Sequence, residues 1–278
     1  MKEKVSIIIP CYNKGAYIKE ALESSLSQTY PNIEIVCYND GSSDNSSAVI
    51  QEFANKYSNF LFIDSKENKG VIAARNSAIE NSSGVYILPL DADDKIAPTY
   101  VEKAVKILEE NSSVGIVYCK AKKFGITECN WILPEYDETD FLYKNCIFVS
   151  ALFRKSDFIK VGGFKQYMDK GLEDWDLWLS LLELGLKPYR INETLFFYRQ
   201  ISENTRTISA NENSYDLFLN IIKNHTGLYL NNTDIAKRLL SYNPNKLLKH
   251  RKVIRKLIIT SIIQLVLIFI LVICLILK

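Results

Sequence analysis

Apolar runs alternate with segments of helical periodicity along the first 90 residues, and this alternation restricts the fold more than any other feature of the sequence. Runs rich in Ile, Val, Leu and aromatic residues occupy positions 4–9, 33–38, 60–63 and 85–88. Strands that are apolar on both faces, each followed by a helix, form a mainly parallel sheet with right-handed crossovers and helices on both sides. The sequence therefore predicts an α/β fold. Pro10 is expected to end the first strand, because proline cannot donate to a ladder.

The second half of the chain has a looser pattern. Helical spacing predicts helices at 101–108 and 156–161 and a third helix with an apolar stripe from Leu177 to Leu182, while apolar runs predict strands at 115–119 and 148–153 and an edge strand at 195–198. Residues 120–145 mix charged and aromatic side chains without a clear period. That mixture is typical of an irregular hairpin or of a loop that faces a substrate, and it leaves the element type open.

Polar side chains follow three of the predicted strands. Tyr12 and Asn13 come directly after the first strand, Asp40 ends the second, and Asp91 and Asp93 follow the fourth. In open sheets of this kind, ligands bind beyond the carboxyl ends of the strands, where the strand order reverses. We therefore expect these three segments to meet at one edge of the sheet and to form a binding site there.

The turn after the fourth strand carries three carboxylates in four residues, Asp91-Ala92-Asp93-Asp94. Carboxylates held within a few Å of one another repel unless a cation lies among them, and hard oxygen ligands suit Mg²⁺ or Mn²⁺. This turn therefore predicts a divalent-cation site at Asp91, Asp93 and Asp94. The alternative is a solvated turn in which Asp94 caps the helix that follows Pro98.

A fourth acidic residue, Asp174, precedes the apolar stripe of its helix by three and four positions, so it begins on the inward face. A carboxylate in the first turn of a helix is stabilised as an anion by the helix dipole. Asp174 is therefore either a helix cap or a general base that takes a proton from an attacking hydroxyl. Trp178, which belongs to the stripe, and Trp175 are expected to pack in the core.

The net charge of the chain is +2, so no basic excess indicates nucleic-acid binding. The six cysteines form no Cys-X-X-Cys pair, and four of them lie in or beside apolar runs, which is typical of reduced, buried thiols. The two histidines lie far along the chain, at His225 and His250, so neither a histidine-based triad nor a zinc site is predicted.

The C-terminal segment 257–277 has 21 residues without a charge, which is about the length needed to span a bilayer as a helix. The preceding segment, 246–256, carries six Lys and Arg residues and no acid, which predicts a cytoplasmic N-terminal domain. We therefore expect a single-pass membrane protein with a domain at 1–205, a helical and basic juxtamembrane segment at 206–256 and a transmembrane helix at 257–277.

Seven motifs occur in one order along residues 4–205. They are Val5 to Asn13, Asn39-Asp40-Gly41-Ser42-Ser43-Asp44, Asn68-Lys69-Gly70 with Ala74-Arg75-Asn76, Asp91-Ala92-Asp93-Asp94, Gly162-Gly163-Phe164, Glu173-Asp174-Trp175-Asp176 and Tyr198-Arg199. In these motifs and their order the chain resembles the family 2 glycosyltransferases. The resemblance implies the GT-A fold, a Rossmann-like sheet flanked by helices, and an inverting reaction.

The resemblance also implies roles for individual residues. Asp40 and the segment from Pro10 through Tyr12 to Asn13 would contact the base of a nucleotide-diphosphate sugar, and Arg75 would face the phosphates. Asp91, Asp93 and Asp94 would hold the ribose and a divalent cation, Mg²⁺ or Mn²⁺. Asp174 matches the catalytic base of the family.

The expected activity is inverting transfer of a sugar, with a uridine diphosphate sugar as the first candidate donor, to a hydroxyl group of a membrane-associated acceptor in surface glycan synthesis. That acceptor is a lipid-linked sugar or a growing glycan. Two alternatives stay open. One is a sugar nucleotidyltransferase, although the Gly-rich basic loop it needs after the first strand is replaced by Pro10-Cys11-Tyr12-Asn13. The other is a catalytically inactive, membrane-tethered binding module.

Overall fold

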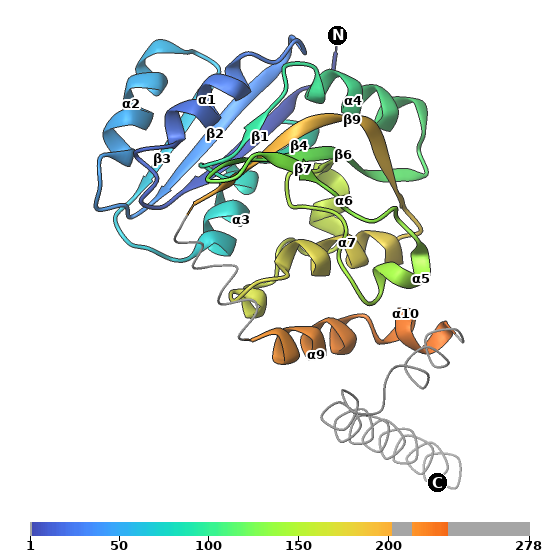
Figure 1. Cartoon of the computed structure of the whole chain (residues 1–278). Coiled ribbons are helices and arrows are strands. Elements are labelled where there is room, and N and C mark those ends of the chain that lie inside the picture. The colour runs from blue at the N-terminus through green and yellow to red at the C-terminus, as the bar shows by residue number, and fades with distance from the viewer. Residues whose placement is uncertain (1, 202–212, 233–278) are drawn as a thin grey trace, which may run out of the picture. The chain divides into compact units, whose positions relative to one another are not determined.

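The computed structural model describes residues 2–201 and 213–232. In the first half of the chain, strands and helices alternate as predicted. The elements there are β1 (Val5–Cys11), α1 (Ile18–Leu26), β2 (Ile33–Asp40), α2 (Ser46–Lys56), β3 (Phe60–Ser65), α3 (Val71–Asn81) and β4 (Tyr86–Pro89). Helices α1 and α2 lie on one side of the sheet and α3 lies on the other, so both faces of these strands are covered (Figure 1).

The second half contains shorter and less regular elements. They are β5 (Lys95–Ile96), α4 (Tyr100–Glu110), β6 (Val114–Gly125), β7 (Cys129–Trp131), α5 (Glu138–Phe141), β8 (Leu152–Arg154), α6 (Lys155–Lys160), the 3-10 helix η1 (Gln166–Met168), α7 (Glu173–Glu183), β9 (Lys187–Gln200), α9 (Ser214–Asn224) and α10 (Thr226–Asn231). The region 120–145, for which the sequence left the element type open, holds the end of β6, the hairpin strand β7 and the single turn α5.

The strands of the described residues form one sheet in the order β3-β2-β1-β4-β8-β6-β9-β5, with β7 paired to β6. Strands β3, β2, β1 and β4 are parallel, whereas β8 runs antiparallel to both of its neighbours and β5 runs antiparallel to β9. The prediction of a mainly parallel sheet is therefore correct for the first four strands and wrong for the whole sheet, which is mixed. Strand β8 is not preceded by a crossover helix of the length that a parallel neighbour requires.

Two predictions about strand ends are also corrected. Pro10 lies within β1, which continues to Cys11. The carbonyl of Ile8 accepts a hydrogen bond from Leu90 of the chain beyond β4, and Pro10 faces the same side two residues later, where β4 no longer pairs with β1. The missing N–H therefore costs no ladder bond. The segment 195–198 is the end of the long strand β9, which lies between β6 and β5 and so is not an edge strand.

The core confirms the packing role of the two tryptophans. Trp175 and Trp178 are buried, and their indole N–H groups donate to the carbonyl oxygens of Phe141 and Ile147. A buried indole is stable where its single polar group has a partner, as it does here. The cysteines of the described residues carry no disulfide, and those at positions 11, 37, 119 and 146 are buried.

Helix α9 packs on α7 within the compact unit that ends at Tyr229. Phe218 stacks on Trp175 with 5.9 Å between ring centroids. Behind this contact the imidazole of His225 is buried between two carboxylates of α7, with Nε2 at 3.3 Å from Asp176 and Nδ1 at 3.2 Å from Glu183. The described residues from position 213 onward thus include a helix that packs against the same unit.

The predicted membrane segment 257–277 lies outside the described residues, as does the basic segment 246–256. Within residues 2–201 and 213–232, every helix is too short or too polar to cross a bilayer. The membrane anchor therefore stays a prediction.

We predict that the contact of α9 with α7 makes stability depend on pH. Burial alone lowers the pKa of His225, but the hydrogen bond and charge of Asp176 and the charge of Glu183 outweigh it and raise that pKa. The stabilisation is fully present below the unfolded-state pKa of about 6.5 and is lost as the pH rises through the higher folded-state pKa. Urea denaturation should show the free energy of unfolding falling over that range.

The variant His225→Gln should lose this pH dependence. The control Lys223→Gln, on an exposed side chain of the same helix, should keep it. Equal pH dependence in wild type and His225→Gln would contradict the assignment.

Candidate active site

A pocket of about 560 Å³ opens at the carboxyl ends of β1 and β4. The strand order 3-2-1-4 reverses direction between these two strands, which is the expected place for a ligand site in such a sheet. Seven residues that the sequence proposed for the site line this pocket: Pro10, Tyr12, Arg75, Asp91, Asp93, Asp94 and Asp174. The fold therefore brings the acidic turn and the start of α7 to one cavity.

The three carboxylates of the acidic turn do not converge on one point. Asp91 pairs with Arg75 and Asp93 pairs with Lys14, while Asp94 accepts a hydrogen bond from the backbone N–H of Arg199. Among the described residues, no group of three or more acidic, cysteine or histidine side chains is arranged to hold a metal ion. The three carboxylates thus do not form the cluster that the sequence predicted, because each one is paired with a different residue.

Asp94 is the most buried member of the turn, with 2% of its surface exposed. Burial, together with the charges of Asp93 and Asp91, raises its pKa well above the ordinary value. Its carboxylate accepts the N–H of Arg199 at 2.7 Å, and the Nε of Arg199 donates to the carbonyl of Asp93 at 2.8 Å. Asp94 therefore fastens the end of β9 to the turn and does not cap the following helix, whose N-cap residue is Thr99.

Lys14 is the cation nearest to Asp93. Its Nζ lies 2.6 Å from Oδ2 of Asp93. Partial burial alone lowers the pKa of this ammonium group, but the charges of Asp93 and Asp91 outweigh that effect and raise it. Lys14 thus stays charged inside the pocket, beside a carboxylate that keeps 17% of its surface exposed.

Arg75 links the two sides of the pocket. Its guanidinium is 1% exposed, donates to Asp91 at 2.5 Å and donates to Glu173 at 2.5 Å. Burial alone lowers the pKa of Arg75, but the two carboxylates outweigh it and raise the pKa, so the group is always charged. The resemblance implied that Arg75 faces phosphates. In this structure its two terminal nitrogens instead hold the acidic turn and the first residue of α7.

Asp174 lies in the pocket at the beginning of α7, next to Glu173. The residue before this helix turn, Leu172, has a φ of 61°, in the left-handed region that a leucine rarely adopts. Backbone strain of this kind collects at functional sites. The carboxylate Oδ1 of Asp174 accepts the N–H of Trp175 at 2.7 Å, which orients this side chain.

Two predicted residues do not line the pocket. Asp40 is buried, and its carboxylate accepts the backbone N–H groups of Lys69 and Gly70 at 2.8 and 2.9 Å. The amide oxygen of Asn13 accepts the N–H of Ser43. In this structure both side chains fix the loops around the carboxyl ends of β1 and β2.

Part of the pocket wall is apolar and aromatic. It contains Trp131 at the end of β7, Leu133 after it, Phe148, and Phe196 and Tyr198 of β9. The rings of Trp131 and Tyr198 lie 4.9 Å apart, and those of Phe148 and Phe196 lie 4.3 Å apart. One pocket therefore combines a charged side with a side suited to the apolar face of a ring.

Residues 6–172 match the model of the family described as Glycosyl transferase family 2. The chain belongs to the family 2 glycosyltransferases. It is 34% identical over 213 residues to the Escherichia coli UDP-Glc:alpha-D-GlcNAc-diphosphoundecaprenol beta-1,3-glucosyltransferase WfaP, covering 76% of this chain and 81% of that protein. It is 31% identical over 207 residues to the putative glycosyltransferase EpsE of Bacillus subtilis, covering 72% of this chain and 74% of that protein.

Solved structures agree on the fold of this glycosyltransferase. The mannosyltransferase PcManGT of Pyrobaculum calidifontis, solved with GDP-Man and Mn²⁺, superposes with a TM-score of 0.65 at 19% identity, covering 92% of this chain and 81% of that one. TarS of S. aureus, solved with UDP-GlcNAc, superposes with a TM-score of 0.62 at 17% identity, covering 87% of this chain and 77% of that one. The predicted GT-A-like α/β fold is confirmed.

Sequence reasoning missed three features of the glycosyltransferase pocket. Lys14 directly follows the Tyr12-Asn13 pair, and Glu173 directly precedes Asp174. Both residues therefore lie in or next to a family motif, but the motif gave them no role. Trp131 had no such signal, because the segment around it has no hydrophobic periodicity. Its place in the pocket depends on the pairing of β7 with β6.

We predict that Arg75→Met destabilises the fold by about 3–5 kcal/mol, because it leaves the buried carboxylate of Glu173 without its cation. The double variant Arg75→Met/Glu173→Gln should recover part of this loss, with a coupling of about 0.5–3 kcal/mol. Urea denaturation of the four proteins measures that cycle.

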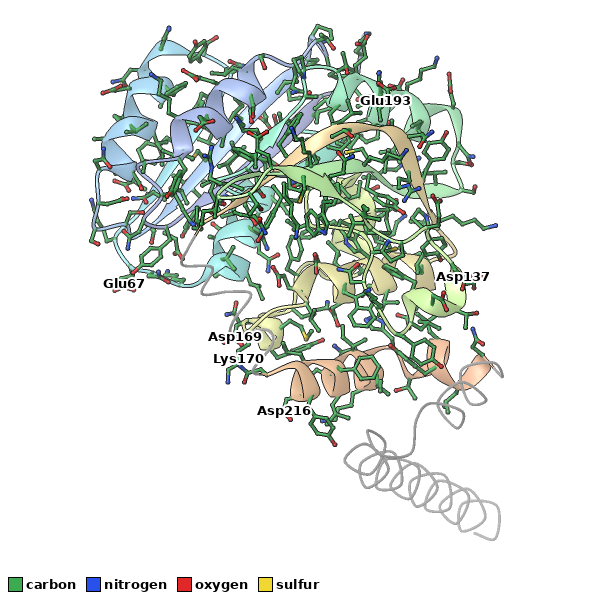
Figure 2. All side chains as sticks on the ribbon, viewed as in Figure 1. Glu67, Asp137, Asp169, Lys170, Glu193 and Asp216 are labelled. Atoms are coloured by element: carbon green, nitrogen blue, oxygen red, sulfur yellow. The ribbon has the colours of Figure 1, made fainter. Side chains whose placement is uncertain are left out.

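The matched control is the solvent-exposed pair of Lys103 and Glu193. Glu193 lies at the surface of the molecule (Figure 2). The same cycle there, Lys103→Met and Glu193→Gln, should give about 1 kcal/mol or less. Additive effects at Arg75 and Glu173 would show that the buried pair does not hold the pocket together.

Proposed function

We propose that the protein transfers the sugar of a uridine diphosphate sugar, with inversion, to a hydroxyl group of a membrane-associated acceptor in surface glycan synthesis. The observation that carries this proposal is the shared pocket, which is lined by Asp174 in the first turn of α7 and by Asp91 and Asp93 after β4. A carboxylate base on one side and a charged site for a diphosphate on the other are what a direct displacement needs.

The reaction follows from these positions. The acceptor oxygen attacks the anomeric carbon of the donor sugar, and the bond from that carbon to the diphosphate oxygen breaks. Asp174 takes the proton of the acceptor hydroxyl, and the nucleoside diphosphate leaves with the bonding electron pair. Attack from the side opposite the leaving group inverts the anomeric configuration.

The donor proposal is supported by similarity. WfaP is named for transfer from UDP-Glc, and TarS was solved with UDP and with UDP-GlcNAc. The acceptor proposal is supported by the name of WfaP, which includes a diphosphoundecaprenol-linked sugar, and by TuaG of Bacillus subtilis, named for teichuronic acid biosynthesis. A lipid-linked sugar or a growing glycan is accordingly proposed as the acceptor.

We also propose that the pocket holds a divalent cation together with the donor. Mg²⁺ and Mn²⁺ suit one or two carboxylates, with water and the phosphates of a substrate completing the shell. Asp93 and Asp91 are the candidates, because both line the pocket and keep part of their surface exposed, whereas Asp94 is buried and bonded to Arg199. A bound cation would stabilise the charge of the diphosphate leaving group.

We further propose a single-pass membrane protein with its catalytic domain on the cytoplasmic side. This rests on the uncharged segment 257–277 and on the basic segment 246–256 before it. Such an anchor would hold the pocket near a lipid-linked acceptor.

We predict that Asp174→Asn lowers sugar transfer by about 10²–10⁴-fold, because the acceptor hydroxyl loses its general base. Binding of UDP, measured by calorimetry, should be unchanged. The control Asp169→Asn changes an exposed carboxylate in the loop before α7 (Figure 2) and should keep full activity.

The assay reads the nucleoside diphosphate released from a panel of sugar nucleotides, with detergent-solubilised full-length protein and a membrane lipid extract. Donor binding without turnover of any donor would favour the inactive binding module. Release of inorganic pyrophosphate from a nucleoside triphosphate and a sugar phosphate would favour the nucleotidyltransferase. If Asp174→Asn transferred sugar at the wild-type rate, Asp174 would not be the base.

Metal dependence gives an independent prediction. Complete chelation should abolish transfer, and Mg²⁺ or Mn²⁺ should restore it, since the leaving diphosphate needs a cation. Asp93→Asn should raise the metal concentration needed for half-maximal activity, whereas Glu67→Gln, an exposed carboxylate after β3, should not. Activity that survives complete chelation would contradict the metal role.

A further inference from the structure

A second pocket, of about 480 Å³, lies along the N-terminal half of β9. It is lined by Tyr118 of β6, by Glu135 and Tyr136 before α5, and by Pro188, Tyr189, Arg190 and Asn192 of β9. Asp137, the residue after this lining segment, lies at the surface beside α5 (Figure 2). The catalytic residues described above do not belong to this lining.

The chemistry of the second pocket suits a sugar ring. Three of its residues are tyrosines, and Tyr189 keeps 47% of its surface exposed. The side chain of Arg190 is largely buried and pairs with Glu135, so its guanidinium is held in place. Tyrosine rings present an apolar face with a polar tip, while arginine, glutamate and asparagine offer planar hydrogen-bonding groups. A pyranose has the matching pattern of an apolar C–H face and hydroxyl edges.

The second pocket lies next to the catalytic pocket along the chain segment 133–135. Leu133 lines the catalytic pocket and Glu135 lines the second one, and two residues of chain span at most about 7 Å. A further link runs through Phe148, which lines the catalytic pocket and whose ring centroid lies 6.2 Å from that of Tyr118 in the second pocket. The two pockets are thus close enough for neighbouring units of one sugar chain.

We propose that the second pocket binds a sugar unit of the acceptor that lies further along the chain than the unit that receives the transferred sugar. The acceptor is therefore an oligosaccharide of several units. This inference rests on the proposed function and adds the acceptor's class to it. The aromatic wall around Trp131 lies in the catalytic pocket, from which the 131–136 segment leads to Tyr136.

The test measures saccharide binding by saturation-transfer NMR and calorimetry on full-length protein in detergent with saturating UDP. The probes are glucose, N-acetylglucosamine, galactose and mannose, with their linear di-, tri- and tetrasaccharides. At least one tri- or tetrasaccharide should bind more tightly than its monosaccharide. Tyr189→Ala should weaken binding of that oligosaccharide by about tenfold and leave binding of the monosaccharide unchanged.

The matched control is Tyr167→Ala, which removes an equally exposed tyrosine ring on η1 and should leave all saccharide binding unchanged. Absence of oligosaccharide binding across the panel, or equal binding by wild type and Tyr189→Ala, would overturn the inference. Binding of UDP and Asp174-dependent turnover of the donor are measured separately. If they persist, the second pocket has failed as an acceptor site while the proposed function stands.

Discussion

The buried guanidinium of Arg75 is the interaction on which the geometry of the pocket depends. A charge removed from water needs partners of opposite charge, and Arg75 has two, Asp91 at the end of β4 and Glu173 at the start of α7. These partners are separated by some 80 residues of chain, and the ion pairs fix both relative to α3. The carboxylate of Asp174, adjacent to Glu173, is positioned by the same contacts.

The three aspartates of the turn have different partners. Asp91 compensates Arg75, and Asp94 holds the end of β9 through Arg199. Asp93 pairs with Lys14 and keeps 17% of its side-chain surface exposed in the pocket, against 34% for Asp91. Three neighbouring aspartates thus have three distinct environments. One turn therefore combines the structural contacts of Asp91 and Asp94 with the cation site proposed for Asp91 and Asp93.

The residues after position 205 contribute to the same unit through α9. Phe218 and His225 pack on α7, the helix that begins at Glu173 and contains Asp174. A helix whose N-terminus carries the proposed base is therefore covered on its far side by the segment that leads toward the predicted membrane anchor. This arrangement gives the C-terminal part of the chain a structural role in addition to the anchoring proposed for it.

The sequence by itself determined the strand and helix alternation, the edge of the sheet where the site lies, and the family motifs with Asp174 among them. These features are local, because hydrophobic period and proximity to a strand end can be read from neighbouring residues. Only the tertiary structure decided the mixed direction of the sheet, the pairing of Arg75 and the place of Trp131 in the pocket. Each of these depends on contacts between residues far apart in the chain, and neither propensity nor spacing encodes which distant partner satisfies a buried charge or strand edge.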